Sequence, residues 1–142
     1  MASKVVSLRL KETEAAYLVH QARLMQRTQG ETAALLLSEK LREAEFPLIE
    51  FRPTTSGREV FVRGTRLKVW QVVMHARCGS GAEQIAESLA MPVEKIQAAL
   101  DYYDAYAPEI DAILEEIEGT TYEKLRRKLP GLQLIRVSEL GD

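Results

Sequence analysis

Five consecutive apolar residues at positions 33–37 lie in a segment that is marked as a helix, and they constrain the fold more than any other feature. Thr28 and Glu31 have the spacing of a capping box, which predicts that a helix begins there and runs to about Glu45. A run of five covers more than one face of a helix. This helix must therefore be buried on several sides.

The residues before this helix are too few to bury it. Residues 4–10 place Val6, Leu8 and Leu10 on one face with a period of two, which predicts a half-buried strand, and a first helix follows from about Glu12. One strand has two unpaired edges, and about 45 residues is near the lower limit for a stable core. A second copy would pair the strands as an antiparallel ribbon and pack the two leucine-rich helices together. The sequence therefore predicts an obligate homodimer.

A short strand, a helix and a capped helix over residues 3–45 resemble the ribbon-helix-helix family of bacterial repressors. The resemblance implies that the paired strands enter the major groove of DNA and that outward side chains contact base edges. The positions that carry over to this role are Val5, Ser7 and Arg9. The resemblance also implies that the capped N-terminus at Thr28 holds a phosphate through backbone N–H groups. The alternative is a ribbon that only dimerises.

A second unit is expected after Pro47, because the residue before a proline leaves the helical region. Residues 52–57 are rich in turn formers and predict a loop, residues 59–63 predict a short strand, and residues 67–69 can pair back as a small hairpin. Three helical patterns follow up to Tyr106. The last two are joined by a tight turn, which is the helix-turn-helix arrangement.

Charge is distributed in blocks along this second unit. Residues 52–77 carry six Lys and Arg against one Glu, whereas residues 83–118 carry ten carboxylates against one Lys. Phosphates repel an acidic helix, so the second helix of the pair is a poor DNA reader, and its exposed face is predicted to contact a protein through Tyr102 and Tyr106. The candidate phosphate contacts lie on the basic edge, at Arg63, Arg66 and Lys68. The alternative is that the arginines pair with the acidic helices.

The Arg63-Gly64-Thr65-Arg66 motif, with Leu67 and Val69 behind it and an Ala-x-x-Leu-x-Met-Pro turn at residues 86–92, resembles the antitoxin-associated family catalogued as domain of unknown function 433. The resemblance covers about residues 50–110. Ser-Gly-Arg-Glu at residues 56–59 replaces the Gly-Gly-Lys-Pro-like stretch that is usual in the family. Members look like antitoxins of bacterial toxin–antitoxin pairs, often beside a toxin with a PIN-like nuclease fold. The resemblance therefore implies a toxin partner.

The C-terminal residues are expected to form a basic arm. Gly119 predicts the end of an acidic helix, Thr120 and Glu123 form a second capping box, and residues 132–137 predict a strand that could add to a sheet edge. A cation inserted into a PIN-like active site would compete with the metal for its carboxylates. The candidate toxin contacts in the arm are Arg126, Arg127, Lys128 and Arg136. The alternative is a solvated helix packed on its own domain.

The sequence offers no constellation for catalysis or metal binding. His20 and His75 lie far apart without nearby ligands, and phosphate-loop and nucleophile-elbow patterns are absent. Cys78 is alone, which excludes an internal disulfide and favours a cytoplasmic location, and no apolar run approaches membrane-spanning length. We expect a protein without enzyme activity, metal, cofactor, small-molecule substrate or membrane association.

The expected fold is mainly α with short β elements. It comprises a dimeric ribbon-helix-helix domain at residues 1–46, a helix-turn-helix or winged-helix-like domain at residues 50–118, and the arm at residues 119–142. The favoured function is an antitoxin that binds operator DNA as a homodimer, represses its own operon and neutralises a PIN-like ribonuclease toxin. The alternatives are a stand-alone transcriptional regulator and a protein-interaction module that does not bind DNA.

Overall fold

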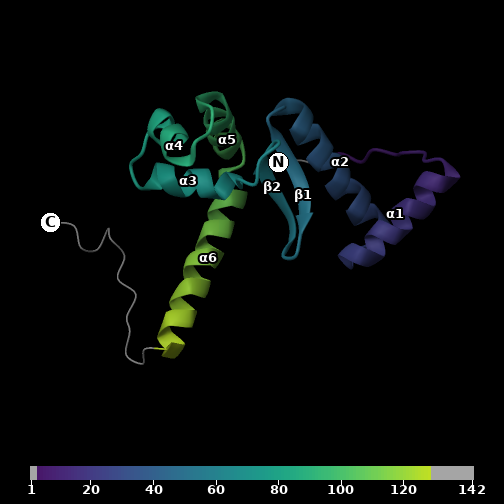
Figure 1. Cartoon of the computed structure of the whole chain (residues 1–142). Helices are drawn as coiled ribbons and strands as arrows, with labels where there is room; N and C mark the ends of the chain where they lie inside the picture. Colours follow the sequence, from purple (N-terminus) through teal and green to yellow (C-terminus); the bar gives the residue numbers. More distant parts are fainter. Residues whose placement is uncertain (1–2, 129–142) are drawn as a thin grey trace. The chain divides into compact units, whose positions relative to one another are not determined.

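The computed structural model describes residues 3–128, and this range contains six helices and one two-stranded antiparallel hairpin (Figure 1). The predicted class, mainly α with short β elements, is confirmed. The chain divides into two compact units. Unit 1 contains the residues up to Pro47 together with Phe51–Glu59, and unit 2 contains Leu48–Glu50 and the residues from Val60 onwards. The hairpin therefore contributes its tip to unit 1 and its base to unit 2.

Two helices that pack against each other form most of unit 1, α1 (Glu12–Met25) and α2 (Gln29–Glu45). The predicted N-cap of α2 is confirmed, because the Thr28 hydroxyl accepts a hydrogen bond from the N–H of Glu31 at 3.1 Å. The hydroxyl of Thr32 donates to the carbonyl of Thr28 at 2.8 Å, and Thr32 is fully buried. These bonds satisfy polar groups that the start of a helix otherwise leaves without partners.

The segment before α1 forms no strand in the single chain. Residues 3–10 have no regular secondary structure and are exposed throughout, with Val6 at 71% and Leu8 at 58% exposure. A strand is held by hydrogen bonds to a neighbouring strand, and the described part of this chain supplies none next to it. The apolar side chains predicted to be half-buried consequently lie in solvent.

The hairpin consists of β1 (Ile49–Thr54) and β2 (Gly57–Val62), so the loop predicted at residues 52–57 is confined to a turn at residues 55–56, and the rest of that range is strand. The turn-forming residues at 52–54 lie in a strand because a strand of a two-stranded sheet tolerates proline, whose missing N–H can face solvent. The actual turn is short. The hydroxyl of Thr54 donates to the carbonyl of Gly57 at 2.8 Å, and Gly57 has a φ of 116° that suits glycine.

Unit 2 is built from four helices, namely α3 (Val69–Arg77), α4 (Ala82–Leu89), α5 (Val93–Ala105) and α6 (Ala107–Lys128). α5 packs against the other three helices, and α3 packs against both α4 and α6. A three-residue turn joins α4 to α5, as expected, and Ala90 adopts a left-handed conformation there. The core is formed by fully or largely buried side chains: Ile49, Val60, Phe61, Val62, Val69, Val72, Val73, Ile85, Ala86, Ile96, Ala99, Tyr102, Ile110 and Leu114.

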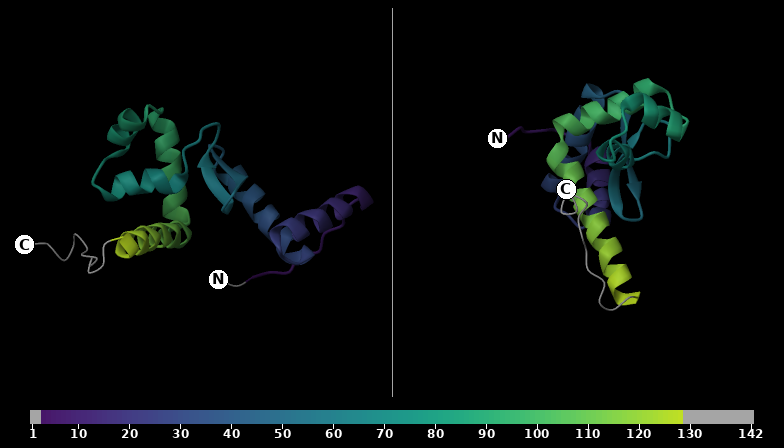
Figure 2. Two further views of the ribbon diagram at one scale, coloured as in Figure 1. Left: turned by 60° about the horizontal axis from the view of Figure 1, so that its bottom comes forward. Right: turned by 90° about the vertical axis from the view of Figure 1, so that its left-hand side faces the viewer.

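α6 is one continuous helix, so the break predicted at Gly119 is wrong. Its first half packs on α3 and α5 through Ile110 and Leu114, and the rest projects away from these helices (Figure 2). A single glycine costs a helix only about 1 kcal/mol, which does not end it. The hydroxyl of Thr121 donates to the carbonyl of Ile117 at 3.0 Å, a bond that follows the helix across the glycine.

We expect Gly119→Ala to stabilise α6 locally by about 1 kcal/mol, because alanine has the higher helix propensity and a Cβ at this position would meet no atom within 4 Å. Slower amide hydrogen exchange at residues flanking position 119 would show the gain. The same substitution at Gly57 is the control. With its φ of 116°, Gly57→Ala should destabilise the hairpin, and a loss of stability in both variants would contradict the prediction.

Candidate interaction surfaces

The Arg-Gly-Thr-Arg motif at residues 63–66 forms a tight turn between β2 and α3. Gly64 has a φ of 73°, a conformation that favours glycine. The hydroxyl of Thr65 donates to the carbonyl of Val62 at 2.8 Å and accepts from the N–H of Leu67 at 3.0 Å. The N–H of Val62 donates to the carbonyl of Leu67 at 2.8 Å. The turn therefore holds the chain against the base of the hairpin. The pairing predicted for residues 67–69 is present there as a single β-bridge.

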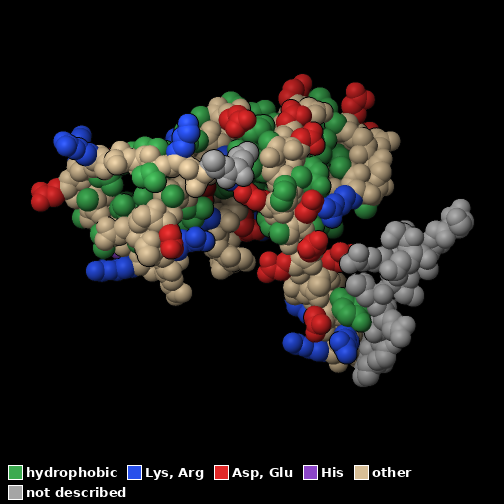
Figure 3. Space-filling view, turned by 180° about the vertical axis from the view of Figure 1, so that it is seen from behind, with side chains coloured by type: hydrophobic (Ala, Val, Ile, Leu, Met, Phe, Trp, Pro, Cys, Tyr) green, Lys and Arg blue, Asp and Glu red, His purple; other side chains and the backbone are tan. Residues whose placement is uncertain are grey.

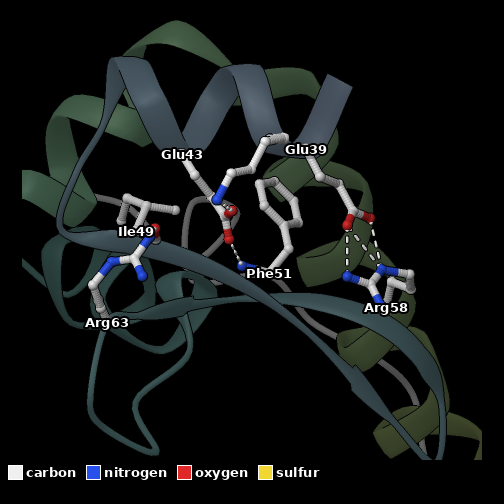
Figure 4. Close-up of polar contacts among 7 residues, drawn as sticks. Glu39, Glu43, Ile49, Phe51, Arg58 and Arg63 are labelled. Carbon is white, nitrogen blue, oxygen red and sulfur yellow. Dashed lines mark hydrogen bonds and ion pairs between the residues drawn. The ribbon is translucent and has the colours of Figure 1, made fainter. Parts of the chain in front are cut away.

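Two of the three candidate phosphate-binding side chains in this region have partners in unit 2. The backbone N–H of Arg63 donates to the carbonyl of Leu48 at 2.7 Å, and its Nη2 donates to the carbonyl of Ile49 at 3.1 Å (Figure 4). The Nζ of Lys68 lies 5.9 Å from the centre of the Phe61 ring. Arg66 is exposed. Both arginines of the motif are therefore exposed, but Arg63 is held at the turn by hydrogen bonds to backbone carbonyls.

Arg58, another of the six cations between residues 52 and 77, is bound to a buried carboxylate in unit 1. Its Nε lies 2.8 and 2.9 Å from the two carboxylate oxygens of Glu39 on α2, and its Nη2 lies 2.7 Å from Oε1 (Figure 4). Glu39 is only 6% exposed. The N–H of Phe51 donates to Oε1 of Glu43, one turn further along α2, at 3.0 Å. We call this pair of contacts the hairpin clasp. The alternative drawn from the sequence pairs the arginines with the acidic residues 83–118, whereas Arg58 pairs with α2.

The tyrosines assigned to a protein-binding face are largely engaged within unit 2. Tyr102 is 1% exposed, so it cannot present a contact surface, and its assignment as a toxin contact is corrected. Its position on the inner face of α5 follows from the helical spacing that also buries Ile96 and Ala99. Tyr106 is half-buried, and its ring centre lies 4.9 Å from that of Tyr102.

A polar cluster links α3, α5 and α6 beside these rings. The hydroxyl of Tyr103 donates to Oδ1 of Asp111 at 2.7 Å, and Arg77 forms an ion pair with the same oxygen. A hydrogen bond between Arg77 and Tyr103, with a further contribution from the charge of Asp111, raises the pKa of Arg77 above its usual value. The cluster fixes the docked half of α6.

Residues 49–103, from the start of β1 into α5, match the family model described as a protein of unknown function, DUF433. This segment is a DUF433 domain. The match contains the turn at residues 63–66, and it confirms the resemblance drawn from that motif. Neither α1 and α2 nor α6 falls within it. No curated protein and no solved structure shows significant similarity to the chain.

The helix that follows the DUF433 domain changes charge along its length. Residues 107–118 of α6 carry five carboxylates and no Lys or Arg, whereas residues 119–128 carry four Lys and Arg against one Glu. Figure 3 shows acidic side chains along the upper part of this helix and basic ones at its far end. The candidate toxin contacts Arg126, Arg127 and Lys128 are all exposed there, whereas Arg136 and the strand predicted at residues 132–137 lie outside the described residues.

The candidate base-reading residues Val5, Ser7 and Arg9 lie together on the exposed segment that precedes α1. Thr28 is exposed at the start of α2, where its hydroxyl caps the helix and the first backbone N–H groups point outwards from its end. The structure therefore leaves each of these positions accessible to a partner.

Three further findings concern residues 3–128. Within this range no group of three or more His, Cys, Asp or Glu side chains is arranged to hold a metal ion. Of the helices in the same range, none has the length and apolar character needed to cross a lipid bilayer. Cys78 is a free, exposed thiol at the end of α3.

Proposed function

We propose that the protein is the antitoxin of a type II toxin–antitoxin system. In this proposal it is a homodimer that binds operator DNA through its N-terminal segments, and it neutralises a PIN-like ribonuclease through the residues that follow the DUF433 domain. One observation carries most of the weight. An exposed segment with alternating apolar side chains precedes two packed helices, and residues 3–128 of one chain do not cover that segment.

Homodimerisation would give this segment the partner that it lacks. Two copies of residues 4–10, paired antiparallel, satisfy each other's backbone groups and direct Val6, Leu8 and Leu10 towards the helices. Ser7 and Arg9 then lie on the outer face, where a two-stranded ribbon fits the major groove. A two-fold dimer predicts a palindromic operator and repression of the protein's own operon.

The exposed half of α6 supports the second part of the proposal. A helix segment of ten residues without tertiary packing is marginal in water. The cations at residues 124–128 stabilise the C-terminal end of the helix through its dipole, and they also suit a partner that is rich in carboxylates. A nuclease that holds a divalent metal with clustered carboxylates has that character.

Co-expression with the product of the neighbouring gene tests the proposal directly. An antitoxin should co-purify with that product and abolish its toxicity, and a chain truncated after residue 118 should lose both effects. DNA binding without any toxic partner would instead favour a stand-alone transcriptional regulator. Neutralisation without operator binding would favour a module that acts only through protein contacts.

We expect Arg9→Ala to weaken binding to the upstream region of the operon by at least roughly tenfold, because each copy of the dimer would lose a base or phosphate contact. A fluorescence anisotropy titration at several salt concentrations measures both the affinity and its salt dependence, which should also become shallower. Arg23→Ala, at an exposed position in the last turn of α1, is the control and should change little. An Arg9→Ala protein with wild-type affinity would rule out ribbon readout.

A further inference from the structure

The distal half of α6, residues 119–128, is a basic helix segment in which every residue except Tyr122 is exposed. We infer that in the free protein this segment docks on the exposed acidic face of α5 of a second copy. The contact differs from the homodimer proposed above, because it joins helices of unit 2 and involves neither the N-terminal segment nor α2. It can therefore be tested separately from operator binding and from toxin neutralisation.

The packed side of α6 continues into its exposed half. Ile110 and Leu114 are buried where the helix packs on α3 and α5. Ile117, Thr121 and Leu125 follow at spacings of three or four residues, which keep them on the same side of the helix. Ile117 is half-buried, whereas Leu125 is 45% exposed. The side of the helix that is packed in the first half therefore extends into solvent, where a partner can continue the packing.

Cations flank the exposed end of this side. Lys124 and Lys128 lie one turn apart on it, and Arg127 is their neighbour at the spacing of three from Lys124. All three side chains are exposed, and Glu123 is the only carboxylate within residues 119–128. A helix segment of this length is marginal in water without tertiary packing. The surface that stabilises it must therefore offer carboxylates together with an apolar contact for Leu125.

The outer side of α5 has both properties. Five exposed residues share this side, which lies roughly opposite to the residues that α5 buries, and we call them the acidic α5 face: Val93, Glu94, Gln97, Asp101 and Asp104. The face carries three carboxylates and no cation, and its first residue is an apolar side chain that is 37% exposed. Lys95, the only Lys or Arg between residues 78 and 118, is half-buried. The acidic α5 face therefore complements the end of α6 in charge.

The two complementary surfaces are kept apart within one chain. α6 is a continuous helix, its first half is packed on α3 and α5, and its distal half projects away from these helices (Figure 2). A second copy supplies the missing surface, and it also supplies a basic α6 end for the first copy. Two copies can therefore exchange these ends reciprocally, so that one pair of molecules makes the same contact twice.

The contact uses cations that are also candidate toxin contacts, namely Arg127 and Lys128. A toxin that is rich in carboxylates would compete with the acidic α5 face for them. In the free protein the second copy would keep the end of α6 ordered and occupied until the toxin arrives. This consequence rests on the proposed function, whereas the contact itself does not.

Carbodiimide cross-linking of the full chain tests the contact, because this reagent joins a lysine directly to a carboxylate that touches it. An equimolar mixture of unlabelled and isotope-labelled protein separates links between copies from links within one copy. We expect mixed-label links that join Lys124 or Lys128 to Glu94, Asp101 or Asp104. Raising the salt concentration from about 0.1 M to about 1 M should lower their yield at least roughly fivefold, because the Debye length falls from about 10 Å to about 3 Å.

Charge reversal provides the decisive comparison. One variant carries Asp101→Lys and Asp104→Lys, and a second variant carries Lys124→Glu and Lys128→Glu. Each variant alone should give at least roughly fivefold fewer mixed-label links, because like charges then face each other. When the two variants are mixed, each labelled differently, opposite charges meet again, and links between α5 of one variant and α6 of the other should return. A return in the mixture also shows that both variants are folded.

The matched control is Glu83→Lys with Glu87→Lys, which makes the same change of charge at exposed positions of α4 and should leave the yield of links within about twofold of the wild type. Links confined to one label, links that persist after either reversal, an equal loss in the control, or no return in the mixture would each overturn the inference. None of these results would affect the proposed operator binding or toxin neutralisation. A protein that forms the mixed-label links but neutralises no toxin would overturn the proposed function and leave the contact in place.

Discussion

Arg58→Ala is expected to lower the free energy of unfolding of unit 1 by about 3 kcal/mol, which is a large share of the stability of a small domain. The guanidinium of Arg58 makes three close contacts with Glu39, and the Glu39 side chain is 8% exposed. Removing the arginine leaves a buried carboxylate without its cation. The cost is therefore mainly that of an uncompensated charge.

Urea denaturation of the full chain measures this effect, and Lys40→Ala provides the control. Lys40 also faces a carboxylate of α2, but it lies 3.9 Å from Glu43 and its side chain is 81% exposed. Such a pair contributes less than about 1 kcal/mol. Glu39→Gln should cost less than Arg58→Ala, because a neutral amide can remain buried more easily than a carboxylate. Equal, small effects for Arg58→Ala and Lys40→Ala would show that the clasp does not stabilise the unit.

The helices were predictable because their signals are local. Thr28 caps α2 through its own hydroxyl, and the periodic apolar residues of α5 and α6 mark the faces that become buried. The burial of the aromatic residues was predicted less accurately, because the sequence predicts an exposed Tyr102 and the structure buries it. Tyr102 and Tyr103 are adjacent on α5, so both lie near the edge of the same stripe. The choice between them depends on where α3, α4 and α6 pack.

The features that the sequence did not predict depend on distant residues. Pro53 and its neighbours favour turns and predict a loop over the second half of β1, whereas pairing with β2 decides the conformation there. The ion pair of the clasp joins residues 19 positions apart. Glu39 lies in the same helix as Glu43 and Glu45, so nothing local marks it as the carboxylate that becomes buried.

The basic edge shows how charge counts can mislead about function. Six Lys and Arg between residues 52 and 77 predict an anion-binding surface. The structure assigns Arg58 to Glu39, Arg63 to the carbonyl of Ile49 and Arg77 to Asp111. Much of this positive charge therefore serves the fold. The Arg-Gly-Thr-Arg motif of the DUF433 domain is better explained as a structural turn, in which Arg63 is exposed but held by the carbonyl of Ile49, and Arg66 is exposed.

Tyr102→Ala should have the largest effect of any substitution considered, lowering the free energy of unfolding of unit 2 by about 4 kcal/mol. The side chain is 1% exposed and is among the largest fully buried ones, so alanine would leave a cavity where α5 meets its neighbours. Thermal unfolding followed by circular dichroism measures the loss. Tyr106→Ala should cost clearly less, because Tyr106 is only half-buried.

The same pair of variants decides between a core role and a contact role for Tyr102. If Tyr102 belongs to the core, Tyr102→Ala should lose binding to the proposed toxin only as far as it loses folded protein, and binding should return at a lower temperature, where the variant is folded. Tyr102→Phe keeps most of the buried volume and should bind as the wild type does. A folded Tyr102→Ala protein of unchanged stability that fails to bind would instead restore Tyr102 as a contact residue. That result would require α5 to move when the partner binds, because the resting structure encloses this side chain.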